Sequence, residues 1–262
     1  MKNKRSTFSG KLGFVLSAAG ASVGLGNIWR FPYLAAKYGG GIFLLIYILL
    51  AMTFGYTMIM AETSLGRLTR KSPVGAYESF GKSRWLSLGG WINAIIPILI
   101  VPYYSVIGGW VIKYLWEYVL GHGQELASDT YFSSFISNGM SAEICFVVFT
   151  LFTVGIIYAG VRNGIERVSK FMMPILVILS VIIAIYSVTR PGALAGVKYF
   201  LVPNPANFSW MTVVSAMGQM FYSLSIAMGI LVTFGSYMKK EMSIEDSTRN
   251  VEVFDTAIAI MA

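Results

Sequence analysis

The sequence predicts an all-α polytopic membrane protein, and two observations carry this prediction. First, 56% of the 262 residues are apolar, the mean hydropathy is +0.67, and only 12% of the residues are charged. A soluble domain has about twice that charged fraction. Second, the apolar residues gather in runs, several of which reach the ~20 residues that a helix needs to cross a bilayer. We therefore expect a single transmembrane domain covering residues 1–262.

Seven apolar segments are expected to form the helices. They cover about 12–36, 42–65, 85–120, 142–158, 168–188, 210–238 and 253–262. The seventh segment stops at Ala262, which leaves it too short to span a bilayer. We expect this helix to be incomplete and the chain to be truncated.

The basic residues predict the orientation of these helices. The net charge is +8, and most Lys and Arg side chains lie in short loops that fall on one side when the N-terminus is placed inside. This positive-inside bias predicts a multi-pass protein of the cell (inner) membrane with a cytoplasmic N-terminus. It also favours the lipid bilayer over nucleic acid as the partner of the positive charge.

Several classes of chemistry are disfavoured by what the sequence contains. Its single cysteine, Cys145, and single histidine, His122, argue against a disulfide framework, a thiolate cluster and histidine catalysis. The metalloprotease and nucleophile-elbow motifs are missing. Glu62 is interpreted as the only acid deep in an apolar run, and a proton relay normally has more than one member. We therefore expect no enzyme activity.

The first apolar run contains an unusual stretch for a membrane helix. It reads Gly20-Ala21-Ser22-Val23-Gly24-Leu25-Gly26-Asn27-Ile28-Trp29-Arg30-Phe31-Pro32. Each glycine costs about 1 kcal/mol relative to Ala inside a helix, so three of them predict a break near residues 22–25. In a bilayer, a break is tolerated only where the freed backbone lines a cavity or binds something.

The sixth run has the same character, with Gly218, Gln219, three hydroxyl-bearing residues and Gly229 near its middle. Glycines of this kind can also serve close helix packing. Two interrupted segments at corresponding positions, however, favour a transporter built from inverted repeats. Here the chain would hold the first repeat and the start of the second. Oxygen donors without carboxylates suit a weakly held monovalent cation such as Na⁺.

These residues resemble the neurotransmitter:sodium symporter family. The resemblance rests on the core Gly-x-Gly-Asn-x-x-Arg-Phe-Pro of the first segment and on four further groups of residues in the second, third and sixth. They are Gly39-Gly40-Gly41 and Glu62, Tyr103-Tyr104, and Gly218-Gln219-x-Phe221 with Ser223 and Ser225. The resemblance implies the inverted-repeat sodium symporter fold and a structural hydrogen-bonding role for Glu62.

The family also implies two sodium sites. The first would use the carbonyl of Ser22, the side chain of Asn27, the carbonyl and hydroxyl of Ser223, and the carboxylate of the substrate. The second would use the carbonyls of Gly20 and Val23, with its other ligands in an eighth helix beyond Ala262. A chloride requirement stays open, because it depends on the part of the seventh helix beyond Ala262.

The implied substrate site combines backbone and side-chain groups. Its residues are Ala21, Val23, Leu25, Gly26, Ile100, Tyr104, Tyr222, Ser223, Ser225, Ile226 and Met228. Arg30 would belong to the outer gate and Arg5 to the inner gate. Two residues depart from the family pattern: Ala227 replaces a glycine of the sixth break, and Tyr222 stands where a Phe is common.

Gly24 bears on the class of substrate. Amine carriers of this family have an Asp at this position, which holds the amine of the ligand. Gly24 offers no charge, so the expected function is Na⁺-coupled symport of a neutral, hydrophobic amino acid by alternating access. The alternative is a truncated, non-transporting membrane scaffold or regulatory fragment. The sequence leaves the exact amino acid, the stoichiometry and the oligomeric state open.

Overall fold

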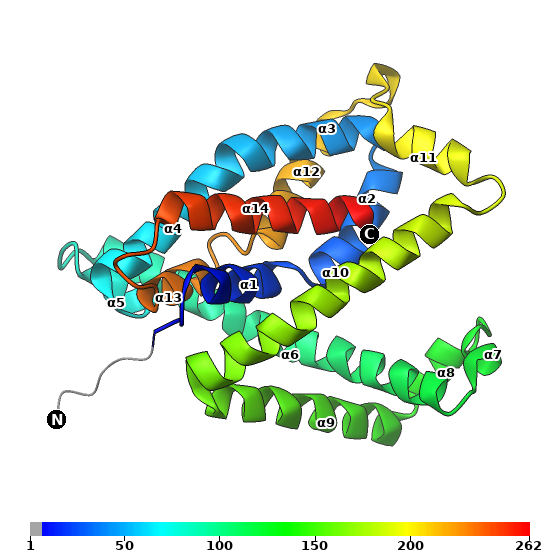
Figure 1. The fold of residues 1–262 in the computed structure, drawn as a ribbon, viewed down its shortest axis with the longest axis horizontal. Coiled ribbons are helices and arrows are strands. Elements are labelled where there is room, and N and C mark those ends of the chain that lie inside the picture. Colours follow the sequence, from blue (N-terminus) through cyan, green and yellow to red (C-terminus); the bar gives the residue numbers. More distant parts are fainter. Residues whose placement is uncertain (1–6) are drawn as a thin grey trace. The chain divides into compact units, whose positions relative to one another are not determined.

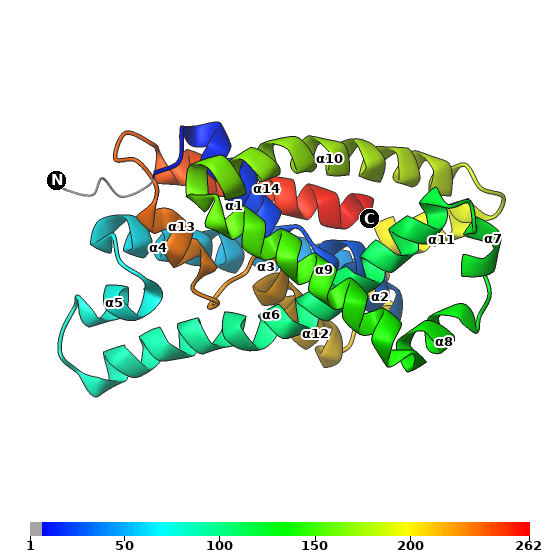
Figure 2. The ribbon, with the colours of Figure 1, turned by 90° about the horizontal axis from the view of Figure 1, so that it is seen from below.

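Helices form the framework of residues 7–262, the part of the chain that this computed structural model describes (Figures 1 and 2). Four helical stretches in this part are long and apolar enough to cross a membrane: Gly41–Thr69, Arg84–Val119, Gly139–Tyr158 and Val161–Val188. A bent pair, Lys11–Ser22 with Gly26–Lys37, makes a fifth if it is counted as one span. The expected all-α, multi-span class is confirmed.

The helices follow one another along the chain in this order. They are α1 (Lys11–Ser22), η1 (Gly26–Arg30), α2 (Phe31–Lys37), α3 (Gly41–Leu50), η2 (Ala51–Gly55), α4 (Tyr56–Thr69), α5 (Pro73–Glu78), α6 (Arg84–Val119), α7 (Gly123–Leu126), α8 (Tyr131–Ser137), α9 (Gly139–Tyr158), η3 (Val161–Glu166), α10 (Arg167–Val188), α11 (Ala193–Leu201), η4 (Pro205–Asn207), α12 (Trp210–Ser223), α13 (Ile230–Ser236) and α14 (Ile244–Met261).

The chain forms two compact units. The second unit, Ile95–Gly160, holds most of α6 together with α7, α8 and α9. Within it, α6 and α9 run side by side (Figure 2). A Cβ placed on Gly109 would lie 2.7 Å from the backbone nitrogen of Phe146, so this close approach requires a glycine.

The first unit holds residues up to Ala94 together with Val161–Ala262. Its core is aromatic and aliphatic, centred on Phe31, Phe43 and Tyr47, which are fully buried. The rings of Phe31 and Tyr47 meet edge to face with centroids 4.9 Å apart, a favourable aromatic geometry. Helix α14 lies beside α1 in this unit (Figures 1 and 2).

A close approach between α4 and α13 also organises the first unit. A Cβ on Gly66 of α4 would lie 2.8 Å from the carbonyl carbon of Val232 and 3.0 Å from the nitrogen of Ser236. In the other direction, a Cβ on Gly235 of α13 would lie 3.0 Å from the Cα of Thr63. The two backbones therefore touch through glycines on both helices, as is common between membrane helices.

Both predicted breaks are present. The first segment stops as α1 at Ser22 and continues as η1, with a bend of 50° between the two parts. The sixth segment stops as α12 at Ser223 and resumes at Ile230. Between them, Ser225 and Ala227 adopt left-handed φ angles of 55° and 61°, a conformation that glycine accepts more readily than Ala.

The seventh helix begins earlier than the expected residue 253. Helix α14 starts at Ile244, inside the charged stretch that precedes Val253. Ser243 caps it by accepting a hydrogen bond from the backbone N–H of Asp246, and Glu245 and Asp246 lie in its first turn. Acidic residues there favour a helix start, because they face the positive end of the helix dipole.

Candidate functional site

The two broken segments meet in the first unit through side chain–backbone hydrogen bonds. The amide nitrogen of Gln219 on α12 donates to the carbonyl of Gly26 at 2.8 Å. The hydroxyl of Ser225, inside the sixth break, donates to the carbonyl of Ala21 at 3.3 Å. The Ser225 contact gives a partner to a carbonyl at the end of α1. The Gln219 contact adds a second donor to the Gly26 carbonyl, which also accepts from the backbone N–H of Phe31.

A carboxylate from the seventh segment joins this meeting point. Asp255 on α14 is completely buried. Its Oδ1 accepts from the Asn27 amide at 2.9 Å, and its Oδ2 accepts from the Ser223 hydroxyl at 2.8 Å. The Asn27 amide also donates to the backbone carbonyl of Asp255 at 3.1 Å. Asn27, Ser223 and Asp255, which we call the oxygen cluster, therefore link three segments far apart in sequence.

The charge of the oxygen cluster is unbalanced. Within residues 7–262, no Lys, Arg or His nitrogen lies within 4.0 Å of the Asp255 carboxylate. Its two side-chain partners are neutral, and burying an unpaired carboxylate is expensive. The cluster therefore favours a small cation. Its carboxylate and hydroxyl oxygens are hard ligands. The Asn27 amide turns its nitrogen toward Asp255, and its Oδ1 accepts a hydrogen bond of 3.3 Å from the backbone N–H of Gly24. No group of three or more His, Cys, Asp or Glu side chains that could hold a metal occurs in the described residues.

Asp255 was missed by the sequence reasoning, and the interpretation of Glu62 as the only deeply placed acid is wrong. Asp255 is 0% exposed, and Glu252, one turn earlier on α14, is 7% exposed. The sequence feature that could have indicated Asp255 is its place as the third residue of the last apolar run, which begins at Val253. The sequence does not single it out, because a seventh segment beginning at 253 places this carboxylate near a helix end.

Glu62 supports the sixth break from α4. Its Oε1 accepts a hydrogen bond of 2.7 Å from the backbone N–H of Ala227, and its Oε2 has no partner among the described residues. The side chain is 6% exposed. Glu62 thus caps backbone that left the helical pattern, in agreement with the structural role that the resemblance implied.

The other residues assigned to binding divide between the two units. Ala21, Val23, Leu25, Gly26, Tyr222, Ser223, Ser225, Ile226 and Met228 belong to the two broken segments of the first unit. Tyr222 packs on Gly26 so closely that a Cβ there would lie 3.1 Å from the ring. Ile100 and Tyr104 lie on α6 in the second unit, and their roles stay predictions.

The residues assigned to gating and to a second sodium site have different surroundings. The guanidinium of Arg30 lies 4.9 Å from the centre of the Tyr222 ring, a cation–π contact beside the breaks. Arg5 lies outside the described residues. Gly20 and Val23 border a cavity of about 490 Å³ between α1 and α10. The sodium roles of Gly20, Val23 and Ser22 stay predictions.

Comparison with known proteins places this arrangement in a family. The family model described as the sodium:neurotransmitter symporter family matches residues 5–127 and 132–262. The chain belongs to this family. Its relatives include an uncharacterized sodium-dependent transporter of Bacillus subtilis, YhdH, which is 36% identical over all of this chain and 58% of its own length. The chain thus spans less than two thirds of that relative.

Other members of the sodium:neurotransmitter symporter family match over similar lengths. An uncharacterized sodium-dependent transporter of Methanocaldococcus jannaschii is 34% identical over 99% of this chain and 54% of its own length. The crystal structure of MhsT in complex with L-phenylalanine superposes with a TM-score of 0.90 at 35% identity, covering 98% of this chain and 59% of that chain. The resemblance and the symporter fold are confirmed.

Proposed function

We propose that the protein couples inward flow of Na⁺ to uptake of a neutral, hydrophobic amino acid across the cytoplasmic membrane by alternating access. The observation that supports this proposal is the buried carboxylate of Asp255, which accepts hydrogen bonds from Asn27 and Ser223. Among the described residues, no cationic side chain forms an ion pair with this carboxylate. A small cation entering this cluster would relieve the cost of the buried charge. Because Asn27 and Ser223 flank the two breaks, an ion there would tie α14 to both broken segments.

The proposed substrate class rests on the side chains around the breaks. Val23 and Ile226 are buried apolar residues, and Tyr222 adds an aromatic face. Gly24 provides no carboxylate for an amine ligand. MhsT, whose crystal structure contains L-phenylalanine, has the same fold. An amino acid with a large apolar side chain fits these features, and its own carboxylate would add a ligand to the sodium ion.

The coupling is tested by uptake of radiolabelled phenylalanine and leucine into vesicles holding the protein expressed from its full-length gene. We expect uptake with an inward Na⁺ gradient and none when choline replaces Na⁺. Uptake that persists in choline without a pH gradient would show that Na⁺ is not the coupled ion.

The role of the oxygen cluster is tested by Asp255→Asn. This change keeps an oxygen and the shape of the side chain but removes the charge. A charge-assisted contact contributes about 1.5–3 kcal/mol, so the apparent Na⁺ affinity should fall about 10- to 150-fold. Glu245→Gln is the control, because Glu245 is an acid in the first turn of the same helix, α14, and has no hydrogen bond or charge interaction with Asp255. Equal Na⁺ affinities in the two variants would contradict the assignment.

A further inference from the structure

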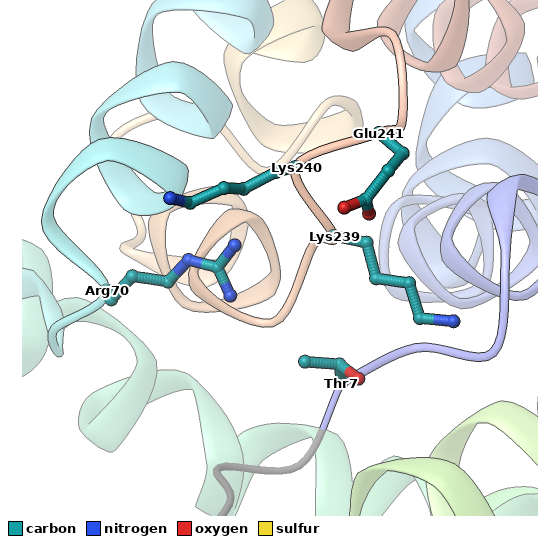
Figure 3. Close-up of a pocket in the computed structure, with 5 residues that line it drawn as sticks. All are labelled: Thr7, Arg70, Lys239, Lys240 and Glu241. Carbon is teal, nitrogen blue, oxygen red and sulfur yellow. The ribbon is translucent and has the colours of Figure 1, made fainter.

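A basic pocket lies in the first unit, away from the oxygen cluster. It has a volume of about 480 Å³ and is lined by Thr7, Arg70, Lys239, Lys240 and Glu241. Arg70 extends into it from the end of α4, while the two lysines and Glu241 come from the loop between α13 and α14 (Figure 3). We call this the basic pocket.

The charge of the basic pocket is not neutralised. Three cationic side chains and one carboxylate line the basic pocket, and none of these four groups forms an ion pair within residues 7–262. The ammonium of Lys239 donates to the uncharged carbonyl of Ser9 at 2.8 Å. The sequence before Thr7 contains further basic residues and no acid. Positive charge concentrated in a concave site attracts anions.

Besides the Lys239–Ser9 hydrogen bond, the walls of the basic pocket are held by contacts that do not involve its charges. The loop is anchored by Met238 and Met242, which are 0% and 9% exposed. Arg67, one turn before Arg70, donates from Nη1 to the carbonyl of Met242 at 2.5 Å. Arg70 itself adopts a left-handed φ of 56° and closes α4 by donating its N–H to Gly66. Such a conformation in a residue other than glycine is held by its surroundings.

The position of the basic pocket indicates the source of the anion. Arg70 directly follows Thr69, where the apolar span Gly41–Thr69 ends, so it is expected at the depth of the lipid headgroups. Leu68 is 74% exposed beside it and offers an apolar surface for acyl chains. An arginine with flanking lysines is the side-chain set that binds phosphate oxygens.

We propose that the basic pocket binds the phosphate of an anionic phospholipid headgroup. The phosphate would meet the guanidinium of Arg70 and the ammonium of Lys240, with Lys239 and the Thr7 hydroxyl at the opposite wall (Figure 3). Glu241 would oppose binding and favour headgroups that offer hydroxyl donors. This site does not depend on the proposed transport function, since it uses none of the residues assigned to Na⁺ or substrate.

The test measures lipid binding to the delipidated chain by native mass spectrometry in a neutral detergent. The probes are phosphatidylglycerol, phosphatidylcholine as the zwitterionic reference, and inorganic phosphate as a competitor. We expect selective retention of phosphatidylglycerol that millimolar inorganic phosphate does not displace. Displacement by equimolar phosphate would overturn the lipid assignment in favour of a soluble anion.

Charge variants localise the binding. Arg70→Gln with Lys240→Gln should weaken phosphatidylglycerol binding roughly 30-fold, given the usual contribution of each basic residue near a membrane surface. Lys82→Gln with Arg84→Gln removes two exposed charges that do not line the basic pocket and should leave binding within about threefold. Equal weakening in both double variants, or none in either, would overturn the proposal.

Two single variants test the proposal without changing Arg70, whose substitution could impair folding. Lys240 is exposed and makes no hydrogen bond or ion pair with the described residues, so Lys240→Glu should fold normally and still weaken binding. Glu241→Gln should strengthen binding, because it removes the one carboxylate of the basic pocket. Glu245→Gln, an exposed acid outside it, serves as the control. A strengthening that is equal in both Glu variants would overturn the proposal.

Discussion

The contact between α4 and α13 predicts that Gly66→Ala destabilises the fold. The atoms that a new Cβ would meet are the carbonyl of Val232 and the nitrogen of Ser236, both of them backbone. Backbone cannot rotate away, so the two helices must separate. Overpacking of this kind typically costs about 1–3 kcal/mol. For a chain of this size, we expect the unfolding temperature to fall by about 2–12 °C.

The assay is thermal unfolding in detergent, followed by tryptophan fluorescence, with Gly218→Ala as the control. Gly218 also lies inside a helix, α12, but a Cβ there would have nothing within 4 Å. Alanine is the better helix former by about 1 kcal/mol, so this variant should unfold at the same or a higher temperature. Equal unfolding temperatures for the two variants would refute the argument that backbone contact fixes this helix pair.

Two further predictions concern single residues. Ala227 has a φ of 61°, so Ala227→Gly should raise stability by up to about 1 kcal/mol through released strain; a lower unfolding temperature would contradict this. In the second unit, the Nδ1 of His122 lies 2.6 Å from the Glu117 carboxylate, and this hydrogen bond raises the pKa of His122 above its ordinary 6.5. The interaction therefore stabilises the fold below the unfolded-state pKa, and the stabilisation is lost as pH rises through the folded-state pKa. Because the chain has one histidine, NMR of histidine-labelled protein should show one titration whose midpoint falls in Glu117→Gln; an unchanged midpoint would exclude the Glu117 contact in solution.

The breaks were predictable from sequence because their cause is local. Three glycines within Gly20–Gly26 weaken a helix wherever it packs, and the bend after Ser22 appears where they lie. The same holds for the sixth segment, where polar residues and Gly229 coincide with the interval between α12 and α13. The lengths of the apolar runs likewise predicted the long helices. The length of a spanning helix is set by the thickness of the bilayer and does not depend on which other helices pack against it.

The oxygen cluster was only partly predictable because its last member depends on tertiary structure. Asn27 and Ser223 stood out as polar residues inside apolar runs. Asp255 sits in a helix whose first half is charged, and only the packing of α14 against other helices of the first unit buries it. Glu252 is buried for the same reason. Periodicity within one segment carries no information about which distant helix will cover it.

The link between Asn27 and Asp255 also has a consequence for biosynthesis. The two residues are 228 positions apart in the chain. At ribosomal speeds of about 5–20 residues per second, roughly 10–45 s separate the synthesis of Asn27 from that of its partner. For most of this interval the first segment is available for insertion before its partners Gln219 and Ser225 in the sixth segment have been made. Its early entry into the bilayer must therefore be assisted by water, lipid headgroups or the insertion machinery until the sixth segment and then α14 arrive.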